Sequence, residues 1–325
     1  MKITYYVQRY RPEFEAISKE IQILNDHFNK LHDTRIFNLH LDGFFNLNLK
    51  KDFFSTHFIF YPFLVPSTFY HSKKRDLNHI YTSLGDLPYL KVIDLKKTIL
   101  TAAASCNEEK IKKRLTQLRQ LKKIIVESEY QKRQLLDLNI AESKIKVIFP
   151  PVDLNKYNYQ EPPTEQKFTI LYASCPTRLE DFEKRGINLI IGIAKNQKEL
   201  VFNLAWRNGP LAEIKELIVK NKLNNFNVKN EIVVDMNEKY ASSHCTIIPY
   251  TKFDNFLKLI PNSAIESLAA GKPILVSEKT EIARIVKTTG CGVVFEPTES
   301  SLSEAIRKLR ENYNFYQKQT IKTAQ

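Results

Sequence analysis

The chain has 325 residues, a formal net charge of +13, 43% hydrophobic residues and 11% aromatic residues. This composition excludes a disordered or collagen-like polymer, because it supplies enough apolar side chains to bury one large core or two ordinary ones. The sequence contains neither G-x-G-x-x-G nor G-x-x-x-x-G-K-S/T, which argues against a simple dinucleotide-dependent dehydrogenase and a P-loop ATPase.

The cysteines and the first residues predict where the protein works. The four cysteines, Cys106, Cys175, Cys245 and Cys291, form no C-x-x-C, which argues against a zinc ribbon or a disulfide scaffold and favours a reducing compartment. Arginines interrupt the start of the chain, where a signal peptide needs an apolar run. The longest apolar stretch, 58–65, is far shorter than the roughly 20 residues that span a bilayer. We therefore expect a cytoplasmic protein.

Short β-branched or aromatic runs alternate with longer stretches of helical period along the whole chain. In the first half we expect strands near 2–7, 35–40, 57–61, 78–82, 98–103, 124–127 and 145–149. In the second half we expect them near 168–173, 201–206, 227–229, 245–249, 273–276 and 292–295. This βαβ rhythm predicts an α/β protein with parallel sheets that are covered by helices on both faces.

A proline-rich stretch divides the chain into two similar halves. Residues 149–166 contain four prolines and little apolar periodicity, as expected of a linker. We therefore predict an N-terminal Rossmann-like domain over 1–160, a C-terminal Rossmann-like domain over 161–312, and a tail or helix over 313–325 that returns to the first domain. Doubly wound sheets bind ligands beyond the carboxyl ends of their strands, so we expect the site in a cleft between two facing domains.

The most informative segment is PNSAIESLAAGKPILVS, residues 261–277. It predicts a short helix that is capped by Asn262 or Ser263 and ends at Gly271, followed by a buried strand over 273–276. Ser263 and Glu266 have the S-x-x-E spacing of a capping box, in which the carboxylate only satisfies a backbone N–H. Alternatively, the helix start binds a phosphate while Glu266 accepts hydrogen bonds from a ribose diol. The spacing alone is compatible with both interpretations.

Further matches lie in order around this segment. A strand that ends at Pro249 and a long loop precede it, and TTGCGVVFEPTESSLSEAIRKL follows it. Two further matching segments lie upstream, KKIIVESEYQKRQLLDLNIAESKIKVIFPPVDLNKY and FTILYASCPTRLEDFEKRGINLIIGIA. Taken together, residues 120–312 resemble the retaining glycosyltransferases of family four (glycosyl transferases group 1). The resemblance implies the GT-B fold of two facing Rossmann-like domains. It also implies transfer of a sugar from a nucleotide-diphosphate sugar to a glycan or lipid-linked acceptor, with retention of configuration.

The family has a pair of glutamates separated by seven residues, and Glu266 matches the second of them. Lys258 stands at the first position. A catalytic lysine there would pair with the donor diphosphate or with a carboxylate on the donor sugar; otherwise it is a solvent-facing loop residue. The reversed charge leaves open a noncatalytic nucleotide- or glycan-binding relative, and a nucleotide-sugar 2-epimerase of the same fold is a further alternative.

The resemblance also assigns cationic residues to the donor diphosphate. Arg178 and the Lys184-Arg185 pair before Gly186 match the family's basic loop, and they are otherwise solvated charges beside acidic neighbours. Arg207 after the next strand is either a phosphate or sugar contact or a surface ion pair, whereas Trp206 is expected in the core. The helix start at Asn262, Ser263 and Ala264 is assigned to the donor nucleotide.

The first half carries weaker signals for the acceptor. Arg9 and Arg11 follow the first strand where relatives have paired glycines, and they are candidate cations. Glu13 either orients an acceptor hydroxyl or is, with Glu15, an acid in the first turn of a helix. His79 is expected to be a core histidine, and no general base is nominated.

The sequence predicts no metal cofactor, because it contains no D-x-D, the carboxylate pair with which GT-A transferases hold a divalent ion. The segment 110–123, KIKKRLTQLRQLKK, is expected to form one helix with seven basic residues and no acidic one. Such a cationic face suits an anionic membrane surface, and a peripheral location on the inner face of the membrane follows. No nucleic-acid-binding module accompanies this basic segment, so we expect no nucleic-acid partner.

Overall fold

The computed structural model describes residues 1–40, 48–50, 52–85, 87–162, 167–207, 209–253 and 258–325. The chain divides into two compact units. The first covers Met1–Pro151 together with Asn255–Leu259, and the second covers Val152–Asp254 and Ile260–Gln325. Lys258 and Leu259 therefore group with the first unit, although the chain from Ile260 onward belongs to the second.

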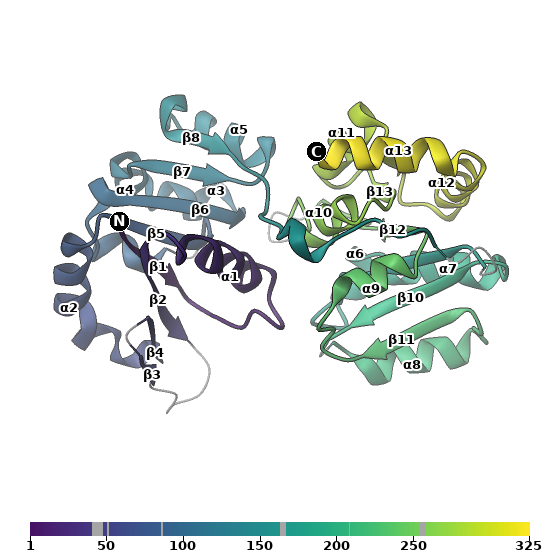
Figure 1. Cartoon of the computed structure of the whole chain (residues 1–325), viewed down its shortest axis with the longest axis horizontal. Helices are drawn as coiled ribbons and strands as arrows, with labels where there is room; N and C mark the ends of the chain where they lie inside the picture. The colour runs from purple at the N-terminus through teal and green to yellow at the C-terminus, as the bar shows by residue number, and fades with distance from the viewer. Residues whose placement is uncertain (41–47, 51, 86, 163–166, 208, 254–257) are drawn as a thin grey trace. The chain divides into compact units, whose positions relative to one another are not determined.

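The first unit is built on an eight-stranded sheet with the order β3-β4-β2-β1-β5-β6-β7-β8 (Figure 1). All neighbouring strands are parallel except β3 and β4, which are antiparallel. The strands are β1 (Lys2–Val7), β2 (Asp33–His40), β3 (Asn48–Leu49), β4 (Phe53–His57), β5 (Leu77–Ser83), β6 (Thr98–Ala104), β7 (Lys123–Val126) and β8 (Ile145–Val147).

Both faces of this sheet are buried, so its central strands β1, β5 and β6 are buried along most of their length. Along β1, Tyr6 belongs to the core cluster on one face, and Tyr5 and Val7 belong to the cluster on the other. The helices of this unit are α1 (Ala16–Phe28), α2 (Tyr61–Lys74), α3 (Glu108–Lys112), α4 (Leu115–Gln120) and α5 (Glu129–Asp137). Ser128 caps α5 by accepting a hydrogen bond from Gln131 N at 3.2 Å.

The second unit contains a six-stranded, all-parallel sheet with the order β11-β10-β9-β12-β13-β14 (Figure 1). Its strands are β9 (Thr169–Tyr172), β10 (Val201–Trp206), β11 (Phe226–Asn230), β12 (Cys245–Ile248), β13 (Ile274–Ser277) and β14 (Gly292–Phe295). The strand order reverses between β9 and β12. In doubly wound sheets this switch point, at the carboxyl ends of the strands, is where ligands bind.

Helices cover both faces of the second sheet. They are α6 (Asp181–Lys184), α7 (Ile187–Asn196), α8 (Leu211–Lys220), α9 (Met236–Ala241), α10 (Asn262–Ala269), α11 (Ile282–Thr289), α12 (Glu299–Glu311) and α13 (Tyr313–Ala324). Trp206 is fully buried in the core of this unit, as predicted. Residues 313–325, for which the sequence suggested a return to the first half, form α13 and group with the second unit.

The α/β class and the two parallel sheets predicted from the sequence are confirmed. Two predicted elements are wrong. The strand expected over 57–61 is the end of β4, a short 3-10 helix (Phe58–Phe60) and the start of α2, because a short apolar run suits either structure and Pro62 fits the first turn of a helix. The single helix expected over 110–123 is instead α3, α4 and the start of β7, which pairs with β6. No helix in the described ranges is long and apolar enough to cross a membrane.

Candidate functional site in the second unit and a buried ion cluster in the first

Arg185 lies at the switch point of the second sheet. Its Nη1 donates hydrogen bonds to Ser174 Oγ, after β9, at 2.8 Å and to Tyr250 Oη, after β12, at 2.6 Å. The guanidinium also lies 5.1 Å from the centroid of the Tyr250 ring. Burial by itself would lower the pKa of Arg185, but Tyr250, Tyr172 and Asp181 outweigh it and the net shift is upward. Arg185 is therefore a fixed, permanently charged cation at the strand ends.

Gly186 allows the close packing beside this arginine. It has φ +75°, and a Cβ atom there would lie 1.9 Å from the backbone oxygen of Pro249. Only glycine combines a left-handed conformation with such an approach. The glycine thus brings the start of α7 against the end of β12.

The other predicted cations around α6 differ in their surroundings. Lys184 is partly buried, and its Nζ lies 2.8 Å from Asp181 Oδ1. Arg178 is exposed in the turn before α6, where its carbonyl accepts a hydrogen bond from Asp181 N at 3.2 Å. Thr251 N donates to the Lys184 carbonyl at 3.1 Å, which ties α6 to the chain that follows β12. This hydrogen bond therefore holds the segment after β9 against the segment after β12.

Arg207 follows β10 and is partly buried. The neighbouring Gly209 packs so closely that a Cβ atom would lie 2.5 Å from both Cys175 Sγ and Pro176 O. Burial raises the pKa of the Cys175 thiol, and nearby backbone N–H groups and Arg207 only partly oppose this. The Cys175 thiol is thus neutral at pH 7. Arg207 contributes the positive charge beside it.

The helix α10 begins at Asn262, with Pro261 in the capping position and no side-chain cap. The caps predicted at Asn262 or Ser263, and with them the capping box, are therefore wrong. Asn262 is partly exposed, whereas Ser263 and Ala264 are buried and Ala264 N donates to the Pro261 carbonyl at 2.9 Å. Ser263 therefore lies inside the helix and not at its capping position.

The buried Tyr240 and the partly buried Tyr157 hold the Glu266 carboxylate. Tyr240 Oη donates to Glu266 Oε2 at 3.0 Å, and Tyr157 also forms a hydrogen bond to this carboxylate. Burial, reinforced by the charge of Glu266, raises the pKa of both phenols, while Arg207 weakly opposes the shift at Tyr240. Glu266 is itself only 7% exposed. The second unit thus brings Glu266 and Arg207 close to the same phenol, that of Tyr240.

Lys258 belongs to a buried ion cluster of the first unit, which corrects the solvent-facing alternative. Its side chain is only 13% exposed, and its Nζ lies 2.8 Å from Glu127 Oε2 and forms a second ion pair with Glu20. Glu20 lies on α1, and Glu127 directly follows β7. Two glutamates from distant parts of the sequence therefore neutralise the lysine.

Tyr81 on β5 completes this cluster. Its Oη donates to Glu20 Oε2 at 2.7 Å and lies 3.4 Å from Glu127 Oε1. Burial raises the pKa of Glu127 well above its ordinary value, and the opposing charge of Lys258 only partly compensates. Coulombic attraction to the two glutamates raises the pKa of Lys258 against the effect of burial. The cluster therefore keeps a charged lysine out of water.

The residues predicted for the acceptor side lie in the loop after β1. Arg9 is exposed and pairs with Glu15 at 3.3 Å. Arg11 N donates to Ser18 Oγ at 2.9 Å, and Ser18 Oγ donates to the Arg9 carbonyl at 3.1 Å, which fixes the loop against α1. Glu13 is exposed in a turn before α1, which begins at Ala16. The prediction of first-turn acids is therefore wrong, and the side chains of Arg9, Arg11 and Glu13 project from a tethered loop.

His79 is a core histidine, as predicted. Its Nε2 lies 2.7 Å from Thr101 Oγ1, and burial lowers its pKa to about 3, so the ring is neutral. No cluster of three or more metal-ligating side chains occurs among the residues that the structure describes.

Sequence reasoning missed the side chains that hold the predicted residues in place. They are Ser174, Tyr250, Tyr157 and Tyr240 in the second unit, and Glu20, Tyr81 and Glu127 in the first. Only Ser174 carried a signal, since it lies two residues beyond a strand in the basic loop. The others contact their partners through tertiary structure alone.

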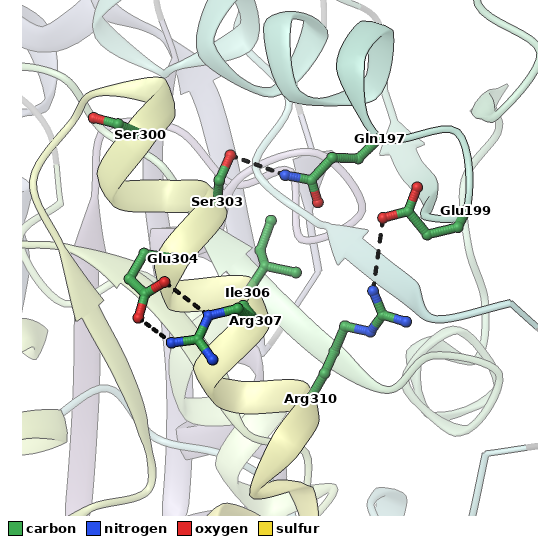
Figure 2. A pocket seen from close by; sticks show the side chains of 8 residues that line it. All are labelled: Gln197, Glu199, Ser300, Ser303, Glu304, Ile306, Arg307 and Arg310. Atoms are coloured by element: carbon green, nitrogen blue, oxygen red, sulfur yellow. Dashed lines mark hydrogen bonds and ion pairs between the residues drawn. The ribbon is translucent and has the colours of Figure 1, made fainter.

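A cavity of about 350 Å³ lies elsewhere on the second unit, between α12 and the end of α7 (Figure 2). Figure 2 shows Arg307 directed at Glu304 and Arg310 directed at Glu199, with Gln197 donating to Ser303. None of the predicted site residues lines it. Because both guanidinium groups are paired with carboxylates, this cavity is not the candidate site.

Comparisons with known proteins agree with this architecture. Residues 182–325 match the family model described as "Glycosyl transferases group 1". The structure of Anabaena Alr3699/HepE in complex with UDP-glucose aligns with a TM-score of 0.76 at 13% identity, covering 100% of this chain and 93% of that chain.

Two further solved structures show the same fold. WaaG, a glycosyltransferase involved in lipopolysaccharide biosynthesis, aligns with a TM-score of 0.70 at 14% identity, covering 99% of this chain and 94% of that chain. A glycosyltransferase from Rickettsia africae ESF-5 aligns with a TM-score of 0.71 at 15% identity, covering 99% and 93% of the respective chains. No curated protein matches this sequence.

Proposed function

We propose that this chain is a glycosyltransferase that transfers sugar from a nucleotide sugar to a glycan or lipid-linked acceptor with retention of configuration. The match of residues 182–325 to the glycosyl transferases group 1 model and the fold shared with solved glycosyltransferase structures support this proposal. The single observation that carries the assignment of the site is the buried Glu266 carboxylate, held by two tyrosines in the unit that matches the family.

Glu266 binds the ribose diol of the donor nucleotide in this proposal. A carboxylate offers about four acceptor positions, so it can accept from two phenols and still accept from adjacent ribose hydroxyls. The phenols fix the orientation of the carboxylate before the nucleotide arrives, which reduces the entropy that binding costs. Uridine is the base to test first, because the Anabaena protein is in complex with UDP-glucose.

The donor diphosphate is bound by cations and by the start of α10. Arg185 is the central cation, because Ser174 and Tyr250 hold it at the switch point of the sheet. Lys184, Arg178 and Arg207 supply further positive charge after neighbouring strands. We assign the start of α10, at Asn262, Ser263 and Ala264, to the same anion site, because the positive end of the α10 dipole lies there.

These groups also act on the reaction itself. Negative charge develops on the leaving diphosphate as the glycosidic bond breaks, and fixed cations stabilise that charge without reorganising. Retention follows if the acceptor attacks from the face that the diphosphate leaves. A phosphate oxygen then takes the proton of the acceptor hydroxyl, so that no protein base is needed. With these cations on the diphosphate, we propose that no divalent metal takes part.

Lys258 supports the site rather than touching the substrate. Its ammonium is paired with Glu20 and Glu127, and its backbone lies four residues before Asn262. The buried cluster thereby fixes one end of the chain segment that leads into α10. The acceptor side is assigned to Arg9, Arg11 and Glu13 on the loop after β1, and the protein acts at the inner face of the membrane.

The test is a turnover assay with a panel of nucleotide sugars, UDP-glucose first, which measures release of nucleoside diphosphate with and without acceptor lipids. We expect release by the wild-type protein and a loss of at least tenfold in Glu266→Gln. Glu216→Gln on α8 is the matched control, since that glutamate is exposed in the same unit. Equal activity of Glu266→Gln and Glu216→Gln would remove Glu266 from the site, and no release from any donor would contradict the proposed activity.

A further inference from the structure

Exposed aromatic and aliphatic side chains gather on one segment of the first unit. The exposed fractions are 81% for Phe63, 56% for Tyr70 and 51% for Ile59, and Phe60 and Phe69 are exposed as well. These residues lie on the short 3-10 helix after β4 and on α2, at the outer margin of the first unit in Figure 1. A patch of this kind on a protein surface marks a site of interaction.

The exposed side of α2 is unusually apolar for a surface helix. Its inward side carries the buried Thr68 and Ser72, which are 3% and 0% exposed, together with Leu64 and Val65, which pack on the core. Thr68 and Ser72 lie four residues apart on one side of the helix, whereas Phe63 and Tyr70, seven residues apart, lie on the other. The side of the helix that faces water is therefore the aromatic one.

Hydrogen bonds from Ser72 and from Arg75, the residue that directly follows α2, hold the helix in this orientation. Ser72 Oγ accepts from Asp94 N at 3.1 Å, and Arg75 donates to Thr4 Oγ1 at 2.8 Å and to the Ile3 carbonyl at 3.1 Å. Rotating α2 to bury its aromatic rings would break these bonds and leave buried polar groups unsatisfied, which is costly. The exposure of the rings is therefore fixed by the fold.

Lysines accompany the rings at the C-terminal end of α2. Lys73 Nζ lies 4.3 Å from the centroid of the Phe69 ring, and Lys74 Nζ lies 4.1 Å from that of Tyr70. Lys97 Nζ donates to the Lys73 carbonyl at 2.8 Å, so a third cation lies beside them. The whole chain carries a net charge of +13. Aromatic rings combined with lysines match the interface of an anionic bilayer.

We propose that this surface docks on an anionic phospholipid bilayer. We call it the α2 surface, and it is formed by Ile59, Phe60, Phe63, Phe69, Tyr70, Lys73 and Lys74. The rings enter the headgroup region while the ammonium groups contact lipid phosphates. The inference rests on the proposed function, because a lipid-linked acceptor presents its reacting group at such a surface.

The observations favour the α2 surface over the basic segment 110–123 as the membrane-binding surface, and they favour a bilayer over a second copy of this chain as its partner. In the basic segment 110–123, the apolar residues Ile111, Leu118 and Leu121 are fully buried, so that segment offers charge without an apolar face. A second copy of this chain would bring the lysines of two α2 surfaces together, which is electrostatically unfavourable.

The test is cosedimentation of the full chain with vesicles of phosphatidylglycerol and phosphatidylcholine in equal parts, at low and high salt. We expect the double variant Phe63→Ser/Tyr70→Ser to lower the partition coefficient at least tenfold. Its matched control is Val219→Ser/Val234→Ser, which replaces two residues of the second unit that are 76% and 99% exposed.

A second pair of variants tests the charge. Lys73→Gln/Lys74→Gln should also lower binding about tenfold at low salt and little at high salt, where exposed charges are screened. Lys215→Gln/Lys220→Gln on α8 should not change it. Wild-type protein should not bind vesicles of phosphatidylcholine alone.

The outcomes separate this inference from the proposed function, because UDP affinity is measured on the same variants in solution. Loss of vesicle binding with unchanged UDP affinity supports docking through α2. Vesicle binding that survives Phe63→Ser/Tyr70→Ser overturns the inference, even if UDP still binds. A wild-type dimer that this variant converts to a monomer, with vesicle binding unaltered, would assign the surface to a second copy and also overturn it.

Discussion

Replacing Lys258 with methionine should destabilise the protein strongly, because it removes the cation between two buried glutamates. Glu20 and Glu127 are 0% and 2% exposed, so water cannot take over the role of the lysine. Removing one partner of a buried ion pair costs about 3–5 kcal/mol. Because methionine keeps most of the side-chain volume, the loss reports on charge and not on a cavity. We expect a loss of about 3 kcal/mol in the free energy of unfolding at pH 8.

The cost should grow with pH. Burial raises the pKa of Glu127 above its ordinary value, and the charge of Lys258 opposes this rise. Removing Lys258 therefore raises the pKa of Glu127 further. A carboxyl with a raised pKa in the folded state contributes stability that is lost as pH rises through that pKa. The difference between variant and wild type should therefore be larger at pH 8 than at pH 6, by up to about 1.4 kcal/mol per pH unit.

The assay is urea denaturation at pH 6, 7 and 8. Lys252→Met is the matched control, because Lys252 is exposed in the chain between β12 and α10, and we expect a change below about 0.5 kcal/mol. Adding Glu127→Gln to Lys258→Met should recover part of the loss, since only one buried carboxylate then remains. If Lys258→Met unfolds at the same urea concentration as the wild type at all three pH values, the ion cluster does not exist in solution.

Three further changes test other parts of the structure. Gly186→Ala should lower the free energy of unfolding by about 2 kcal/mol or more, since φ is +75° and the new Cβ would meet the Pro249 carbonyl; unchanged stability in urea denaturation would contradict this packing. Arg185→Lys should reduce kcat/KM roughly a hundredfold, because lysine cannot reproduce the bonds to Ser174 and Tyr250, and a wild-type value would exclude a catalytic arginine. Saturating EDTA should leave the transfer rate within about twofold, whereas a loss that Mg²⁺ restores would show that a metal takes part.

The parallel sheets could be predicted from the sequence because their strands carry local signals. In β1, for example, four of the six residues are apolar or aromatic, and Tyr5 and Tyr6 are buried on opposite faces of the sheet. The start of α2 was misassigned because its short apolar and aromatic run suits a strand as well as a helix.

The positions of Arg185 and Glu266 could be predicted, but the groups that hold them could not. Tyr240 lies 26 residues from Glu266, and Glu20 lies 238 residues from Lys258. No periodicity or motif connects residues so far apart, because only the packed sheets bring them together. The spacing of Ser263 and Glu266 indicated a cap, yet Pro261 occupies the capping position and the phenols take the carboxylate.

The central claim is that Glu266 binds the donor nucleotide, and calorimetric titration of the wild type and Glu266→Gln with UDP tests it most directly. Replacing the charged acceptor should weaken binding by roughly 1–3 kcal/mol. The tyrosines can still donate to the glutamine oxygen, so the free energy of unfolding should fall by less than the affinity does. Unchanged UDP affinity together with a large loss of stability would show that Glu266 only anchors Tyr157 and Tyr240, and would contradict the claim.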